Sequence, residues 1–283
     1  MFHELFSSRW QEVCQPLSGQ GEFVCTYFTD FARLTPAYYI QGQAPCPTLP
    51  TFPQDLFEGF RRIRQKMLVH LVLNEKEREF WYRGLGESEK RKVQWLLGRA
   101  TAKDAVRLFL KERYRMELCP ADIEIENDRL GKPCLKGGWL SKIPVPPFLS
   151  LAHTEGFAVA IAGTGKDITG IGIDVEPVQE LSADFISRVF RQEEKDLADK
   201  TNKEAGEWLL RFWCVKEAVS KALGSGIRHD PKDIAILSLD QKEKRTTVRL
   251  TGRWTEQFPE KKDKDFLVST FRKGEFVIAL VLL

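Results

Sequence analysis

Residues 208–221 read WLLRFWCVKEAVSK, and residues 95–106 read WLLGRATAKDAV, so a Trp-Leu-Leu triplet and a Lys-acid-Ala-Val block recur at one constant offset. Apolar residues in both stretches return at helical spacing, which predicts two long helices. Each stretch is followed by an Asp-Ile-x-Ile run, at 122–125 and 233–236, whose β-branched alternation predicts a strand. The chain therefore contains an internal repeat.

Both halves of the repeat also close on a similar apolar run, at 156–161 and 274–280. Each half then runs helix, helix, strand and a terminal strand pair. We predict an α+β fold of two pseudo-symmetric lobes, each a small antiparallel sheet packed with a long helix, with the active site in the cleft between them. The first lobe is placed at 61–165 and the second at 166–283.

Residues 1–60 lie outside this repeat and form an N-terminal extension. Phe23, Cys25 and Tyr27 alternate as in a strand, and residues 44–53 are rich in proline, which predicts an extended linker or surface wrap. The extension either packs on the lobes or is the remnant of a junction in a larger synthase polypeptide. The sequence leaves both alternatives open.

The composition is that of an ordinary globular protein. With 283 residues and 42% hydrophobic content the chain can bury a core, and 43 basic against 40 acidic residues give a net charge of +3, too small to indicate nucleic-acid binding. Six irregularly spaced cysteines predict reduced thiols, and the N-terminus lacks the pattern of a secretory signal. Since no apolar stretch approaches the ~20 residues of a membrane span, we predict a cytoplasmic protein with no membrane or nucleic-acid partner. Having both lobes in one chain predicts a monomer.

The acidic residues of the second half are arranged for metal-assisted chemistry. Asp174 and Glu176, in the run GIDVE at 172–176, share one face of a predicted strand, and Glu217 and Lys221 are neighbours at i and i+4 of the predicted helix. If this face of the strand meets the side of the helix that carries Glu217 and Lys221, three carboxylates and one ammonium converge. Such a cluster favours a hard cation, Mg²⁺ or Mn²⁺ rather than Zn²⁺, that bridges phosphate oxygens. The alternatives are solvated acids at a strand end and an ordinary surface ion pair.

GIDVE followed by WCVKEAVSKA resembles the signature of the 4'-phosphopantetheinyl transferases, specifically the larger single-chain type that acts on polyketide and nonribosomal carrier proteins. The strings WLLGR at 95–99, LGKP at 130–133 and SLAHT at 150–154 stand in the order of that family. The resemblance covers roughly residues 60–283. It implies an enzyme that moves the 4'-phosphopantetheine arm of coenzyme A to a serine of an acyl or peptidyl carrier protein, with Mg²⁺ (Mn²⁺ possible) as cofactor and 3',5'-ADP as product.

The resemblance also implies roles for the acidic cluster. Asp174 and Glu217 bind the metal, and Glu176 ligates it directly or through water. Glu217 helps remove the proton of the attacking serine, directly or through a water. Lys221 offsets phosphate charge and either protonates or stabilises the departing 3',5'-ADP oxygen.

The strings of the first half are implied to hold the nucleotide end of coenzyme A. Ser150, His153 and Thr154 come from one element, with His153 near the 3'-phosphate. Lys132 is a phosphate or ribose contact, and Arg99 is suited to a phosphate monoester because its guanidinium is planar and bidentate. Taken alone, a lone histidine is more often structural, and a turn lysine is more often solvated.

The two halves differ in charge, since Asp104 stands where the second half has Glu217 and the first half has no counterpart of Lys221. We infer that the first lobe binds and the second carries the chemistry. The alternative for Lys103 and Asp104 is a solvated helix face. The rival function is a non-catalytic coenzyme A or carrier-domain docking module of a polyketide synthase assembly, and a more distant one is an enzyme that cleaves another pyrophosphate.

Overall fold

The computed structural model describes residues 22–29, 63, 65–154, 157–166, 168–201 and 204–283. The first half contains β1 (Glu22–Thr29), α4 (Glu75–Glu79), the π-helix η2 (Phe80–Gly84), α5 (Glu89–Tyr114), η3 (Pro120–Asp122), β2 (Glu124–Asn127), β3 (Pro133–Lys136), η4 (Gly138–Lys142), β4 (Phe148–Thr154) and β5 (Phe157–Thr164). The second half contains β6 (Ile171–Pro177), α6 (Ala183–Val189), α7 (Gln192–Asp199), α8 (Ala205–Ala222), η6 (Pro231–Asp233), β7 (Ile234–Asp240), β8 (Arg245–Leu250), α9 (Gly252–Gln257), η7 (Pro259–Lys261), β9 (Asp265–Lys273) and β10 (Phe276–Leu282).

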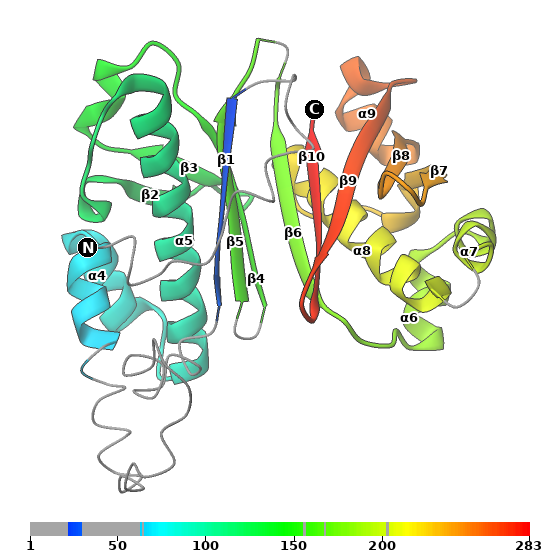
Figure 1. The fold of residues 1–283 in the computed structure, drawn as a ribbon, viewed down its shortest axis with the longest axis horizontal. Helices are drawn as coiled ribbons and strands as arrows, with labels where there is room; N and C mark the ends of the chain where they lie inside the picture. The colour runs from blue at the N-terminus through cyan, green and yellow to red at the C-terminus, as the bar shows by residue number, and fades with distance from the viewer. Residues whose placement is uncertain (1–21, 30–62, 64, 155–156, 167, 202–203) are drawn as a thin grey trace, which may run out of the picture.

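The predicted α+β fold of two lobes is confirmed. In the first lobe α5 lies on an antiparallel sheet of order β1-β5-β4, and β2 and β3 form a separate hairpin. In the second lobe α8 lies on an antiparallel sheet of order β6-β10-β9-β8-β7. Figure 1 shows the first lobe's strands beside β6, β10 and β9 in the middle of the molecule, with α5 on one side and α8 on the other.

The strand order shows that the repeat is more complete than the sequence indicates. β5 is flanked by β1 and β4 as β10 is flanked by β6 and β9, all antiparallel. β1 therefore takes in the first lobe the place that β6 takes in the second. The expected extension, residues 1–60, contributes this strand to the first lobe, which corrects the view that it stands outside the repeat. Backbone pairing needs no similarity of side chains, so the sequence comparison missed it. The proline-rich run at 44–53 lies outside the described residues.

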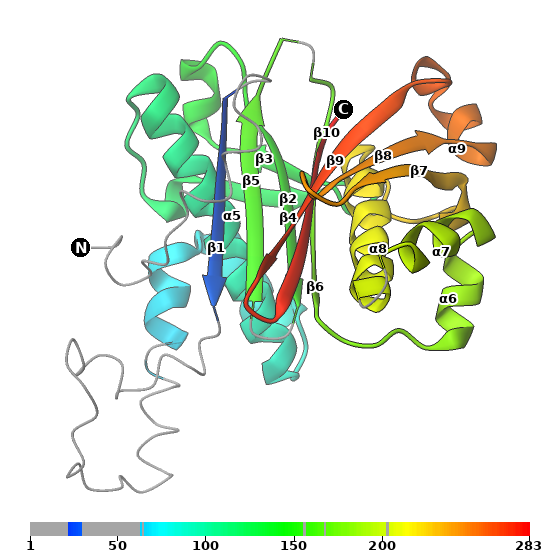
Figure 2. The same ribbon diagram turned by 45° about the vertical axis from the view of Figure 1, so that its right-hand side comes forward.

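The largest apolar layers lie within each lobe and between the two lobes. One lies between α5 and its sheet, and a second between α8 and its sheet. The third joins the lobes, because Ile171, Ile173 and Val175 of β6 and Ile278 and Leu280 of β10 pack against the first lobe's strands. The turned view in Figure 2 shows β4 and β6 side by side at this junction. Since side chains alternate along a strand, the other face of β6 is left for α8.

That other face begins with two glycines. An added Cβ would lie 2.2 Å from the Ala222 carbonyl oxygen at Gly170, and 1.9 Å from the Ala218 carbonyl oxygen at Gly172. Only glycine allows α8 to approach β6 so closely. The next two residues on this face are Asp174 and Glu176, so the close packing brings both acids against α8.

Among the described residues, none of the helices combines the length and the apolar character needed to cross a bilayer.

Candidate active site

Asp174 is buried at the interface of β6 and α8. Its Oδ1 accepts a hydrogen bond from the Lys221 ammonium, with 2.6 Å between Nζ and the oxygen. Its Oδ2 is buried and has no hydrogen-bond partner. A buried carboxylate with one oxygen unsatisfied is costly, so a ligand that reached this oxygen would relieve the cost.

Glu176 is half-buried, two residues further along the same face. Its Oε1 accepts a hydrogen bond of 3.1 Å from the indole nitrogen of Trp213. Trp213, Glu217 and Lys221 recur every four residues on α8 and so form one stripe along the helix. The strand face and the helix stripe therefore meet, as the sequence predicts.

The carboxylates of the cluster repel one another. Burial, together with the charge of Asp174, raises the pKa of Glu217 to about 7. The same two causes, in the same order, raise the pKa of Glu176, although the Trp213 hydrogen bond acts in the opposite direction. Burial alone would lower the pKa of Lys221, but the Asp174 carboxylate outweighs it and raises that pKa. The site thus holds excess negative charge that a single ammonium only partly offsets.

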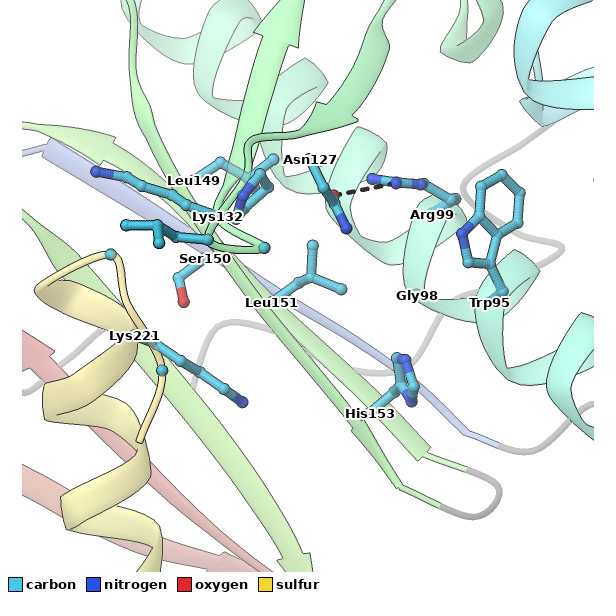
Figure 3. A pocket seen from close by; sticks show the side chains of 15 residues that line it. Trp95, Gly98, Arg99, Asn127, Lys132, Leu149, Ser150, Leu151, His153 and Lys221 are labelled. Atoms are coloured by element: carbon cyan, nitrogen blue, oxygen red, sulfur yellow. Dashed lines mark hydrogen bonds between the residues drawn. The ribbon is translucent and has the colours of Figure 1, made fainter. Parts of the chain in front are cut away.

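A cavity of about 270 Å³ opens beside this cluster, between the lobes. Lys221, Gly224 and Gly226 line it from the second lobe. The first lobe contributes Trp95, Gly98, Arg99, Asn127, Leu130, Gly131, Lys132, Pro133, Leu149, Ser150, Leu151 and His153. In Figure 3 the side chain of Lys221 from α8 and that of His153 from β4 project into the same space. The expected cleft site is therefore present, lined by cations from both lobes.

Arg99 is held at one end of the cavity, by α5. Its guanidinium lies over the ring of Trp95, 5.0 Å from the ring centroid, and donates a hydrogen bond of 3.3 Å to Asn127 Oδ1, drawn dashed in Figure 3. Its Nε is buried without a partner. Buried guanidinium donors normally find partners, so this Nε is an exception to that rule.

His153 and Lys132 line the same cavity from other elements. The His153 ring lies against Gly98 of α5, where an added Cβ would be 3.1 Å from Cδ2. Although the residue is exposed, partial burial of the ring lowers the pKa of His153, and the charges of Lys221 and Arg99 act in the same direction. Lys132 reaches across to the second lobe, since its Cδ is 3.0 Å from the Cβ that Gly224 would carry. Lys132 lines the cavity, and its contact to phosphate or ribose stays a prediction.

Ser150 and Thr154 differ from the other predicted contacts. The Ser150 hydroxyl accepts a hydrogen bond of 3.1 Å from the backbone amide of Ile173, so it ties β4 to β6 while lining the cavity. Thr154 is the last residue of β4, pairs with Phe157, and is not among the cavity-lining residues. The structure therefore places five of the predicted residues around one cavity and leaves Thr154 at the end of β4. The five are Arg99, Lys132, Ser150, His153 and Lys221.

A family model described as the 4'-phosphopantetheinyl transferase superfamily matches residues 170–281, the segment that contains β6 and α8. The holo-[acyl-carrier-protein] synthase of Afipia carboxidovorans is 36% identical over 97 residues, which cover 32% of this chain and 69% of that protein. The chain belongs to the 4'-phosphopantetheinyl transferase superfamily.

Other members of the superfamily are similar over different shares of their length. The 4'-phosphopantetheinyl transferase Sfp of Bacillus subtilis is 26% identical over 123 residues, 43% of this chain and 50% of Sfp. The crystal structure of the holo-[acyl-carrier-protein] synthase of Neisseria meningitidis overlaps 41% of this chain and 97% of that chain, at 23% identity and a TM-score of 0.34.

The donors of this transferase superfamily member suit a hard cation. Asp174, Glu176 and Glu217 supply only oxygen, which magnesium and manganese prefer, and the unsatisfied Asp174 Oδ2 is available. Within the described ranges, no group of three or more His, Cys, Asp or Glu side chains is already arranged to hold a metal. The physical reason lies in a contact described above, because the Lys221 ammonium is bound to the Asp174 carboxylate. The residues fit the cation chemically, and binding requires the carboxylates to turn toward it.

Two features of the site were not predicted from the sequence. Trp213 stands four residues before Glu217, so its place on the stripe was visible in the helical spacing. Asn127 has no comparable signal, since a strand-end asparagine is common. Lys103 was weighed as part of a solvated helix face, but it is almost fully buried and paired with Glu77, so that alternative is wrong for Lys103.

Proposed function

We propose that this protein transfers the 4'-phosphopantetheine arm of coenzyme A to a serine of an acyl or peptidyl carrier protein and releases 3',5'-ADP. The observation that carries the proposal is that α8 packs on the acidic face of β6, where Lys221 binds Asp174 and Trp213 binds Glu176, beside the cavity that Lys221 shares with the first lobe. Superfamily membership supports the same reaction.

The first lobe holds the nucleotide end of coenzyme A in this proposal. The guanidinium of Arg99 lines the cavity and suits the 3'-phosphate, and Lys132 and His153 add contacts to phosphate or ribose. Residues 61–165 thus bind, and residues 166–283 carry the metal ligands and the catalytic groups.

The second lobe moves the proton and stabilises the leaving group. The serine oxygen attacks the phosphorus that carries the pantetheine arm, a new oxygen–phosphorus bond forms, and the bond to 3',5'-ADP breaks. The serine proton goes to Glu217, directly or through a water. Without the metal the pKa of Glu217 is about 7, near the ambient pH at which general bases work best. Lys221 stabilises the departing oxygen.

Asp174, Glu176 and Glu217 would hold Mg²⁺, or Mn²⁺ in its place. When bound, the cation supplies neutralisation of the charge on the pyrophosphate. Lys221, released from Asp174, is then available to the phosphates on the same side of the cavity.

The test is incubation of an apo carrier protein with this protein, coenzyme A and Mg²⁺, followed by mass spectrometry of the carrier. We expect the mass to rise by that of the phosphopantetheine arm and 3',5'-ADP to appear in equal amount. An unmodified mass with several acyl and peptidyl carriers would refute the proposal. A different cleavage product would identify an enzyme acting on another pyrophosphate.

Glu217→Gln separates an enzyme from a docking module. An enzyme should lose transfer by at least about 100-fold while still binding 3',5'-ADP, whereas a module would have no turnover to lose. Asp104→Asn is the matched control, because Asp104 is the repeat counterpart of Glu217 but lines a different pocket on α5. It should transfer at the wild-type rate. The carrier's pathway, the monomeric state and the cytoplasmic location stay predictions of the sequence.

A further inference from the structure

A buried ion pair anchors α8 in the second lobe. Lys216 has no exposed surface, and its ammonium donates to both oxygens of Glu194 at 2.8 and 2.9 Å. It also donates to the carbonyl oxygens of Pro231 at 3.0 Å and Ile234 at 2.9 Å. We call Lys216 and Glu194 the second-lobe lock.

The carboxylate of this lock is satisfied by the backbone as well. Glu194 accepts hydrogen bonds of 2.9 Å from the amide of Arg191, at the start of α7, and of 2.9 Å from the amide of Ile236 in β7. The Glu194 carboxylate therefore links α7, α8 and β7.

The first lobe contains the same construction. The Lys103 ammonium on α5 donates to Glu77 and to the Val72 carbonyl oxygen, the latter at 2.8 Å. Glu77 accepts hydrogen bonds from the amides of Asn74 at 3.1 Å and Ile125 at 3.2 Å. We call Lys103 and Glu77 the first-lobe lock.

The two locks match part for part. Each lysine lies at the same place in the repeated long helix. Each glutamate is the third residue of the short helix that precedes the long helix, and its carboxylate accepts the amide of the N-cap residue. Both glutamates accept a hydrogen bond from the backbone amide of the second isoleucine in the Asp-Ile-x-Ile run, Ile125 or Ile236. Buried charges are tolerated only when their partners are nearly all present, so the duplicated network fixes the rotation of each long helix with little freedom.

Each lock adjoins a different half of the active site. Lys216 directly precedes Glu217, so the second-lobe lock sets the angle at which α8 presents Glu217 and Lys221. Lys103 lies one turn after Arg99, and Ile125 lies two residues before Asn127, the partner of Arg99 (Figure 3). The first-lobe lock therefore holds both members of the Arg99–Asn127 pair.

We propose that the two locks are positioning pairs with separable effects. The second-lobe lock orients the catalytic acid Glu217, and the first-lobe lock orients the Arg99 guanidinium that binds the nucleotide. This inference rests on the proposed transferase function. Neither lock touches substrate in the proposed reaction, so each acts through its neighbour.

The test uses two matched double variants of the full-length protein, Lys216→Met with Glu194→Gln and Lys103→Met with Glu77→Gln. Changing both partners leaves no uncompensated buried charge, and the Gln oxygen can still accept the isoleucine amide. The second-lobe variant should lower kcat for transfer by at least about tenfold with KM for coenzyme A within twofold of wild type. The first-lobe variant should raise that KM by at least about tenfold with kcat within twofold.

Binding measurements keep this test independent of turnover. Calorimetry with 3',5'-ADP should show weakened binding in the first-lobe variant only, and titration with Mn²⁺ should show weakened binding in the second-lobe variant only. If the wild-type protein binds 3',5'-ADP and Mn²⁺ but transfers nothing, the proposed function is wrong. The two titrations then still test whether each lock affects only one of the two binding sites.

A merely structural role predicts a different pattern, because the two locks resemble each other in burial and bonding. Parallel changes in both variants, or no change in either, would overturn the inference. Should a double variant fail to fold, the single Glu→Gln variant of that lock must show the same split. Failure of all four variants to fold would also overturn it.

Discussion

Replacing Gly172 with alanine tests whether the contact of β6 and α8 assembles the site. The new Cβ would stand 1.9 Å from the Ala218 carbonyl oxygen and 2.8 Å from the Ala222 amide nitrogen. Both are backbone atoms of α8, so no side chain can rotate out of the way. Ordinary contact begins near 3.4 Å, which means that helix and strand must separate by roughly 1.5 Å.

This separation has two consequences of calculable size. Overpacking a well-filled interior costs about 1–3 kcal/mol, and we expect the upper end because the clash involves backbone. The Lys221–Asp174 hydrogen bond of 2.6 Å would be stretched beyond bonding distance. Since a misplacement of about 1 Å can cost about 100-fold in rate, transfer should fall at least that far.

The assay combines urea unfolding with the carrier transfer reaction. Gly206→Ala is the matched control, because Gly206 lies on the same helix and an added Cβ would meet no atom within 4 Å. The control should be as stable as wild type or up to about 1 kcal/mol more stable, with unchanged transfer. Equal stability and equal transfer in the two alanine variants would refute the reasoning.

Three further outcomes are expected. Glu217→Gln should stabilise the metal-free protein by up to about 3 kcal/mol at pH 8 and not at pH 4. Folding raises the pKa of Glu217 to about 7, so at any pH above the pKa of the unfolded chain the ionised carboxylate destabilises the folded state. The urea midpoint measured against pH tests this, and a pH-independent difference would contradict it. Gly98→Ala should weaken 3',5'-ADP binding several-fold without lowering the melting temperature, because the new Cβ would press on the His153 ring. Calorimetry and thermal unfolding measure the two effects, and unchanged affinity would show that the contact of residue 98 with His153 does not matter for binding. Trp213→Phe should weaken Mn²⁺ binding by about tenfold, since Glu176 loses the donor that orients it, and an unaltered Mn²⁺ titration would show that the indole has no such role.

Much of the architecture could be predicted because its signals are local in the chain. Helical spacing marked α5 and α8, and the repeat gave two lobes of similar construction. Alternation put Asp174 and Glu176 on one strand face, and the i,i+4 relation put Glu217 beside Lys221. These relations depend only on backbone geometry over a few residues, so they hold whatever the strand and helix pack against.

The tertiary structure decided which partner each group meets, because those contacts join residues far apart in sequence. It placed β1 in the first lobe's sheet and buried Lys103 against Glu77. It paired Lys221 with Asp174 across 47 positions and Arg99 with Asn127 across 28. A pattern of residue types shows what chemistry is available, whereas burial and distance determine which charges neutralise each other. That is why the sequence supplied the acids and cations of this site, and only packing showed the lysine already bound to one of the acids.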